Sequence, residues 1–392
     1  MIKVLSAHTR EIDLADAAVN EILEQLDVEH RLLAHSAGVL YYYPDFAGVV
    51  KKLCERLPFP VLGGTTSNSA VPGTLKSGSD AGGDIILTMT VFTSDTIAFS
   101  AGISEPLGDD PRLPVEKLYR QLMASAPEKT EKPAMLFLIT PRLLQIPGDD
   151  YLAVLDSLSG GVPVFGSIAF THSADFRDIR SCFNGEEYAS SLGILAFWGD
   201  YEPRFFHSII TDDRMINRRA TISESHKNRI RRINGIPAVK YFETIGLAQG
   251  GEIMGVDSFP LILHLKDGSR LVRTVLAVEE GEILCSGAVP PHVPVDFSFC
   301  GKDFVVSSAK KTLLECSKWL RDKPCGGVLI ISCAARRWTL GADVNAELRG
   351  INRILGEASY HFAYSAGEFC PVEVKKGLKN SFCNYSMCIC AV

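Results

Sequence analysis

Residues 38–43 (GVLYYY) and 60–67 (PVLGGTTS) decide the fold of this chain. Each stretch is short and continuously apolar, which is typical of a strand that is buried on both faces. Between them, apolar residues recur at the spacing of an amphipathic helix: Phe46, Val49, Val50, Leu53 and Leu57. The stretch therefore predicts a βαβ unit, with two parallel strands and a helix that covers one face of the sheet.

The same order of elements occurs twice more. The second copy opens at residues 134–140 (AMLFLIT) and reaches residues 163–168 (PVFGSI). The third opens at residues 327–333 (GVLIISC) and reaches residues 362–368 (FAYSAGE). A further apolar strand comes after each copy, at residues 84–89, 192–198 and 385–390. This regularity predicts an internal repeat with three copies.

Between the second and third copies the sequence changes character. Short apolar runs in residues 203–235 and 259–299 alternate with turn dipeptides such as Asn234-Gly235 and Asp267-Gly268, which indicates antiparallel strands. We predict a short helix at residues 237–245 and a longer one that leads into the third copy.

The expected architecture is an α/β fold with two domains. Residues 1–232 form an N-terminal domain with duplicated βαβ-type units at 37–100 and 133–200. Residues 233–392 form a C-terminal domain that joins the antiparallel segment to the third unit.

Composition limits the partners. The 392 residues include 40 Lys and Arg and 46 Asp and Glu, giving a net charge of −6, so neither nucleic acid nor an anionic membrane is an expected partner. Residues 1–8 lack the apolar core of a signal peptide, and no apolar run approaches the ~20 residues that span a bilayer. The eleven cysteines favour a reducing compartment, so we expect a cytoplasmic protein.

Loops that come after parallel strands gather at the carboxyl edge of a sheet, where ligands bind in α/β folds. The predicted rim residues that offer backbone amides and short side chains are Gly63, Thr65, Thr66, Ser67, Gly166, Ser167 and Gly367. No helical pattern comes after Ser67, which disfavours a phosphate-binding loop, and no cofactor is implied.

Two charged residues could serve a ligand at this rim. Arg336 lies shortly after an apolar strand and could bind a carboxylate in a bidentate manner, and Glu368 could bind an ammonium group. Such a pair suits a zwitterion, since each buried charge needs an opposite partner. The alternative is that Arg336 and Glu368 pair with each other.

Cys333 ends the same strand. As an enzyme nucleophile it would need a base such as His361 or His264. Inert packing is the favoured interpretation, because buried cysteines usually behave as small hydrophobes. No Cys-x-x-Cys pair supports a zinc site. Asp149 and Asp150 open a short helix, where a capping function explains them.

Several segments together resemble the FIST family. Residues 60–67 are similar to a FIST N turn, residues 233–238 (INGIPA) to the opening of FIST C, and residues 332–337, 364–368 and 382–386 to its C-terminal blocks. The resemblance implies a prokaryotic sensory protein of signal transduction, with an amino acid or a related small polar metabolite as ligand. It adds Tyr364 and Asn384 to the expected site.

The chain departs from the family at two places: Asn68-Ser69 stand where a Gly-Glu pair is usual, and residues 383–386 (CNYS) keep only the Asn of a His-Asn-Gln-Thr-like run. With no output domain expected, the response would pass to a separate signalling protein. The alternative function is an enzyme that acts on a small metabolite through Cys333.

Overall fold

Each predicted βαβ unit consists of two parallel strands joined through helical segments. The computed structural model describes residues 2–74, 85–128, 130–171, 178–216, 219–254, 258–323, 325–375 and 377–392. The paired strands are β2 (His35–Tyr42) with β3 (Val61–Thr65), β7 (Met135–Thr140) with β8 (Val164–Ile168), and β23 (Val328–Cys333) with β24 (Tyr360–Ser365). The connecting helices are α3 (Ala47–Cys54), α5 (Gly148–Ser159), and α8 (Ala334–Leu340) with α9 (Ala346–Leu355). The predicted α/β class and the three copies are confirmed.

A third strand lies antiparallel to the first strand of every unit. These strands are β5 (Leu87–Ser94), β11 (Gly193–Trp198) and β27 (Met387–Ala391). The strand registers correspond as well, because Tyr42 pairs with Thr65, Thr140 with Ile168 and Cys333 with Ser365. The last residue of each first strand thus faces the last residue of each second strand. The three units are structurally equivalent copies.

Short strands link the three units in a ring. The strand after β3, β4 (Ser69–Ala70), pairs with β24 of the third unit. The strand after β8, β9 (Ser181–Phe183), pairs with β3 of the first unit. The strand after β24, β25 (Glu368–Val374), pairs with β8 of the second unit. Each unit therefore lends a strand to the next, and the exchange closes on itself.

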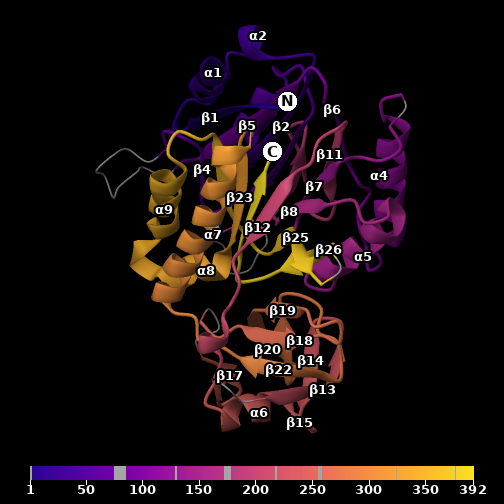
Figure 1. Cartoon of the computed structure of the whole chain (residues 1–392), viewed down its shortest axis with the longest axis vertical. Helices are drawn as coiled ribbons and strands as arrows, with labels where there is room; N and C mark the ends of the chain where they lie inside the picture. Colours follow the sequence, from indigo (N-terminus) through magenta and orange to yellow (C-terminus); the bar gives the residue numbers. More distant parts are fainter. Residues whose placement is uncertain are drawn as a thin grey trace.

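The remaining strands extend these three sheets at their edges. They are β1 (Lys3–Thr9) and β10 (Glu186–Tyr188) in the first, β6 (Ala98–Ile103) and β26 (Gly377–Cys383) in the second, and β12 (Arg204–His207) in the third. Helices cover the outer faces (Figure 1): α1 (Ala15–Leu26), α4 (Arg112–Ala124) and α7 (Lys302–Asp322), besides those of the units, while the short α2 (Val28–Arg31) follows α1 and buries no residue. Short 3₁₀ turns lie at Pro44–Phe46, Asp212–Arg214 and Gly341–Asp343.

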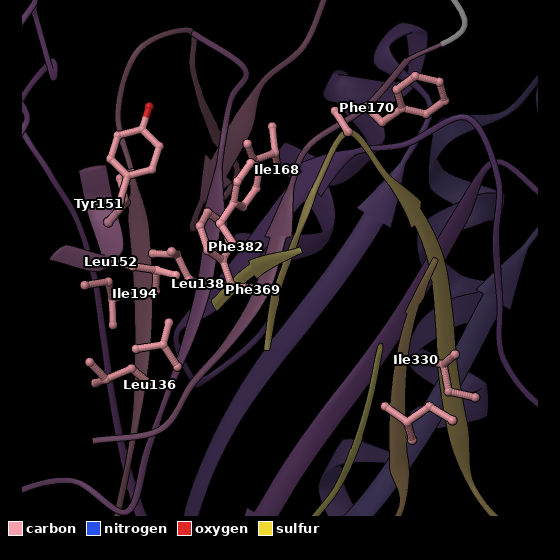
Figure 2. Packing of buried hydrophobic residues seen from close by; sticks show 14 of the residues in the cluster. Leu136, Leu138, Tyr151, Leu152, Ile168, Phe170, Ile194, Ile330, Phe369 and Phe382 are labelled. Carbon is pink, nitrogen blue, oxygen red and sulfur yellow. The ribbon is translucent and has the colours of Figure 1, made fainter. Parts of the chain in front are cut away.

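The sheets are buried on both faces, as the continuous apolar strands predicted. Their inner faces share one core, to which the sheets contribute Tyr41 and Phe92, Phe137 and Phe165, and Ile331 and Cys388. The outer faces of the second and third sheets pack under the helices in another core. Figure 2 shows part of it, with Leu138 near Phe369 and Phe382. The strands are therefore held by packing from two sides.

Residues 220–297 form a separate lobe below the three sheets (Figure 1). Its antiparallel sheet has the order β19-β18-β22-β13-β14-β21-β20, with β15 beside β14. The strands are β13 (Ala220–His226), β14 (Arg229–Ile233), β15 (Ile236–Pro237), β18 (Leu261–His264), β19 (Arg270–Arg273), β20 (Val275–Glu279), β21 (Glu282–Cys285) and β22 (Val293–Phe297). A small hairpin, β16 (Ala248–Gln249) with β17 (Glu252–Ile253), comes after α6 (Ala238–Thr244). The predicted antiparallel segment and its short helix are confirmed.

Residue 233, where we placed the domain boundary, is the last residue of β14 and lies inside the sheet of the lobe. The domain limits at 232 and 233 stay a prediction. All eleven cysteines are free thiols. Within the described ranges, none of the helices combines the length and the apolar character needed to cross a bilayer.

Candidate functional site

The turns after the second strand of each unit meet at one place. The Phe170 amide donates to the Thr65 carbonyl at 2.9 Å, which joins the second unit to the first. The Thr66 hydroxyl donates to the Tyr364 carbonyl at 2.9 Å, which joins the first unit to the third. The Ala366 amide donates to the Ile168 carbonyl at 3.0 Å, which joins the third unit to the second. The ring of exchanged strands thus brings the three predicted rim segments into direct contact.

Most rim groups of the first two units bond to the protein itself. The Thr65 hydroxyl accepts the Arg180 amide at 3.0 Å, and the Ser67 carbonyl accepts the Tyr43 hydroxyl at 2.6 Å. The hydroxyls of Ser167 and Tyr41 are 2.8 Å apart. These hydrogen bonds therefore hold the rim segments of the first two units in place.

Gly63 and Gly166 occupy equivalent positions, since each lies two residues before the last residue of its strand. A Cβ at Gly166 would collide with the Leu138 carbonyl oxygen, and one at Gly63 with the Leu40 side chain. Glycine is required at both by close packing against the neighbouring strand.

Glu368 is a fully buried carboxylate, at 0% exposure, at the start of the exchanged strand β25. Its two oxygens accept hydrogen bonds from the hydroxyls of Ser365 at 2.7 Å and Ser386 at 3.0 Å. Burial raises its pKa to about 8, although the hydroxyls and the Cys333 thiol oppose the shift. Among the described residues, no basic side chain forms an ion pair with Glu368. The site therefore contains a carboxylate without an opposite charge in contact.

Asn384 lies in the turn before β27, directly after Cys383, which pairs with Glu368 across the sheet. Its Oδ1 accepts the Ser286 hydroxyl of the lobe at 2.7 Å. Its Nδ2 is buried and has no hydrogen-bond partner in the described part of the chain. A Cβ at Gly367 would lie 3.4 Å from this Nδ2 and would collide with Phe382. The close approach of Phe382 therefore requires glycine at 367, and Asn384 Nδ2 is an unused donor within the described part of the chain.

Arg336 occupies a different environment from the one predicted. Its guanidinium binds Glu347, with the closest N–O distance at 2.7 Å, and both side chains are 0% exposed. It also donates to the Val305 carbonyl at 3.0 Å. The Tyr364 hydroxyl donates to the same Glu347 carboxylate at 3.0 Å. Arg336 and Tyr364 thus stabilise a buried ion pair behind the rim, and a ligand contact by either stays a prediction.

Cys333 is 3% exposed, and burial raises the pKa of its thiol, with the Glu368 carboxylate adding to the shift. The two bases considered for it bond elsewhere. His361 Nε2 lies 2.8 Å from the Thr88 hydroxyl, and His264 Nε2 lies 2.8 Å from Asp296. The interaction with Glu368 places Cys333 at the site, but a thiol with a raised pKa is a poor nucleophile.

Arg142 was not among the residues predicted from the sequence. It lies two residues after the end of β7 and interacts electrostatically with Cys333, while burial lowers its pKa to about 10. Thr140 and Cys333 are equivalent strand ends, so an alignment of the loops after β7 and β23 could have revealed Arg142. Arg142 is half-buried and brings a positive charge to the surroundings of Cys333.

An ion pair between Arg273 and Asp149 joins the lobe to helix α5. Arg273 of β19 binds Asp149 at 2.6 Å and is itself 0% exposed. The second oxygen of Asp149 accepts the Ala288 amide at 2.7 Å. The predicted capping function of Asp149 is wrong, because no side chain caps α5 and the carboxylate bonds to the lobe instead. Together with the Ser286–Asn384 bond, this contact sets the position of the lobe beside the site.

Three grooves are lined by described residues, and Glu368 lines none of them. One, of about 240 Å³, lies between α7 and residues 207–214. The others lie along α4 and α5, and along α1. In the described ranges, no three His, Cys, Asp or Glu side chains are arranged to hold a metal ion.

Comparisons with known proteins give one family. The FIST N domain model matches residues 36–236 and the FIST C domain model matches residues 212–371. No curated protein matches the chain. Among solved structures, the chain is similar to cyanuic acid hydrolase from A. caulinodans at 12% identity, over 50% of this chain and 70% of that one, with a TM-score of 0.22.

FIST domains are sensory domains of signal transduction that bind small molecules. The FIST N match alone extends over more than half of the 392 residues, and the two matches together extend from residue 36 to residue 371. The FIST N match contains the first two units, and the FIST C match contains the lobe and most of the third unit. The chain therefore belongs to the FIST family.

Proposed function

We propose that the chain senses an amino acid or a related small zwitterion, which binds between Glu368 and Arg142 at the rim, next to the lobe. The observation that supports this most is that, among the described residues, the fully buried Glu368 carboxyl has no bonded cation and the buried Asn384 Nδ2 has no hydrogen-bond partner. A ligand ammonium would stabilise the ionised form of Glu368 and so lower its raised pKa, and a ligand oxygen would accept the Asn384 Nδ2 donor.

The positive charge of Arg142 suits the carboxylate of the same ligand, because a guanidinium binds carboxylates in a bidentate manner. Arg142 and Glu368 each interact electrostatically with Cys333, which supports the proposal that both charges act on one ligand. The hydroxyls of Ser365 and Ser386 hold the carboxylate in place from the protein side. This arrangement favours a ligand with two opposite charges.

The signal would arise from movement of the lobe. The lobe joins the rest of the chain through two neighbouring connections, where Met215 pairs with Ser298 and the Phe299 amide donates to the Arg214 carbonyl at 3.0 Å. A ligand that touches both Asn384 and the rim would favour the closed position over an open one. The response then passes to a separate signalling protein. A cytoplasmic location and a prokaryotic source also belong to this proposal.

The test is a thermal-shift screen of amino acids and related zwitterions, followed by calorimetry on any compound that raises the Tm. Glu368→Gln and Asn384→Ala should each weaken binding at least tenfold. Glu373→Gln is the matched control, because Glu373 lies on the same strand with a 72% exposed side chain and should bind normally. A zwitterion that binds Glu368→Gln as tightly as the unchanged protein would reject the site, and a screen without any stabilising compound would reject the ligand class.

A further inference from the structure

The groove between α7 and residues 207–214 lies where the lobe joins the rest of the chain. Residues 207–214 form the first connection, which leads from β12 toward the lobe beside α7 (Figure 1). Helix α7 begins directly after the second connection, at residues 298–301. Arg214 joins the two connections, because its guanidinium binds Asp303 at 2.8 Å and its carbonyl accepts the Phe299 amide at 3.0 Å. A molecule in this groove would therefore contact both connections of the lobe.

The groove is small and combines apolar side chains with hydroxyls. Its volume is about 240 Å³, and its lining includes Phe304, which is buried, and Ile209, which is 56% exposed. Hydroxyl groups come from both walls: Thr211, Ser307, Ser308 and Thr312. The Ser308 hydroxyl accepts a hydrogen bond from Arg336 at 3.2 Å, so the groove lies next to the buried Arg336–Glu347 pair. A hollow of this size suits single side chains of a partner rather than a whole metabolite.

A second apolar side chain is exposed on α7 next to the groove. Leu314 is 50% exposed and lies three residues after Lys311, which lines the groove, so the two share a face of the helix. The residues of α7 that pack in the core under the helix lie on another face: Ala309, Leu313 and Cys316. Leu314 therefore extends the apolar surface that Ile209 begins.

The exposed face of α7 is basic, although the whole chain has a net charge of −6. Residues 310–323 contain five basic and two acidic residues. The basic ones are all exposed: Lys310, Lys311, Lys318, Arg321 and Lys323. In the ranges that the structure describes, the ion pairs of α7 involve only Lys302 and Asp303 of its first turn. The positive charge around Leu314 is therefore available to an acidic partner.

We propose that this groove and the exposed face of α7 bind an acidic segment of a partner protein. Carboxylates of the segment would pair with Lys311 and Lys318, and its apolar side chains would pack against Ile209 and Leu314. The two exposed apolar residues favour a protein over nucleic acid, which binds basic side chains through its phosphates. The inference rests on the proposed function in one respect, that the partner is the separate signalling protein, because a bound segment would contact both connections of the lobe.

The probe for this surface is a fluorescein-labelled helical peptide with leucine at every third or fourth position and glutamate elsewhere. Fluorescence anisotropy with the full chain measures its Kd. We expect binding at low salt that weakens severalfold at about 0.3 M salt, because exposed charges are screened. Lys311→Glu with Lys318→Glu should weaken binding at least tenfold. The matched control is Lys240→Glu with Lys266→Glu, which makes the same change of charge at exposed positions of the lobe and should bind normally.

Hydrogen exchange of the full chain, with and without the peptide, locates the binding surface. We expect slower exchange in residues 207–214 and 304–315. Absence of peptide binding at low salt, equal Kd values for the two double variants, or protection confined to another part of the chain would overturn the proposal. Competition by an equal concentration of a single-stranded DNA oligomer would also overturn it, in favour of nucleic acid. None of these measurements uses a zwitterion, so their failure is distinct from failure of the ligand site at Glu368.

Discussion

Replacing Arg336 with alanine should destabilise the protein strongly. The guanidinium is 0% exposed and donates to the Glu347 carboxylate through both Nε and Nη2, at 3.1 Å and 2.7 Å. Without it, Glu347 would remain buried and, among the residues that the structure describes, would keep hydrogen bonds from Ser332 and Tyr364 only. Breaking a buried pair by removing one partner costs about 3–5 kcal/mol, a large part of the roughly 5–15 kcal/mol that stabilises a typical fold.

Urea unfolding of Arg336→Ala, followed by tryptophan fluorescence, measures this loss as a lower midpoint. The neighbouring Arg337→Ala is the control. Arg337 is half-buried over the Tyr364 ring at 6.0 Å, which is worth about 0.5–1 kcal/mol. Changing both partners to apolar residues, as in Arg336→Met with Glu347→Leu, should recover most of the stability, because no buried charge is left unpaired.

Equal midpoints for Arg336→Ala and Arg337→Ala would refute this reasoning. They would mean that Glu347 does not depend on Arg336, and that the guanidinium is available to bind a ligand at the rim. The place of Arg336 shortly after an apolar strand predicted ligand binding, whereas its ion pair with Glu347 indicates a function in stability. The experiment therefore distinguishes these two functions.

Other contacts should affect the mobility of the lobe, the pH dependence of stability and the reactivity of a thiol. Asp149→Ala should loosen the lobe by leaving Arg273 buried without its partner, seen as faster hydrogen exchange in β19 and β21, whereas Asp150→Ala should leave exchange there unchanged. Glu368 has its pKa raised from 4.5 to about 8, so the folded state holds a proton that the unfolded state loses. The free energy of unfolding of the unchanged protein should therefore fall relative to that of Glu368→Gln as the pH rises from 4.5 to about 8, and a flat difference would contradict the assignment. Cys333 should react with iodoacetamide far more slowly in the native protein than in urea at about pH 7, measured by mass spectrometry of the labelled peptide, and equal rates would show that the thiol is accessible.

The repeat could be predicted from the sequence because its signal is local. A strand such as β23 is buried on both faces and is therefore largely apolar along its length, and a helix such as α3 shows its buried stripe of Val49, Val50 and Leu53 at a regular spacing. The antiparallel lobe was predictable for the same reason, since its turns contain their own marker residues.

The partners of the charged residues could not be predicted, because they depend on contacts between distant segments. Glu347 lies in an amphipathic helix, where an acidic residue is normally solvated, and nothing nearby in the sequence marks it as the partner of Arg336. Asp149 looked like a helix cap because its true partner, Arg273, is 124 residues away. The exchanged strands β4 and β9 have two and three residues, too few for any periodic pattern.

The ring of exchanged strands explains why the candidate site lies where it does. Because β25 leaves the third unit and pairs with β8 of the second, its first residue, Glu368, lies opposite Ser167 and contacts two units at once. Asn384 then connects this place to the lobe through Ser286. A ligand bound to Glu368 and Asn384 would therefore touch the second unit, the third unit and the part of the chain that contacts the lobe. A sensor needs this arrangement, because its ligand must distinguish two conformations.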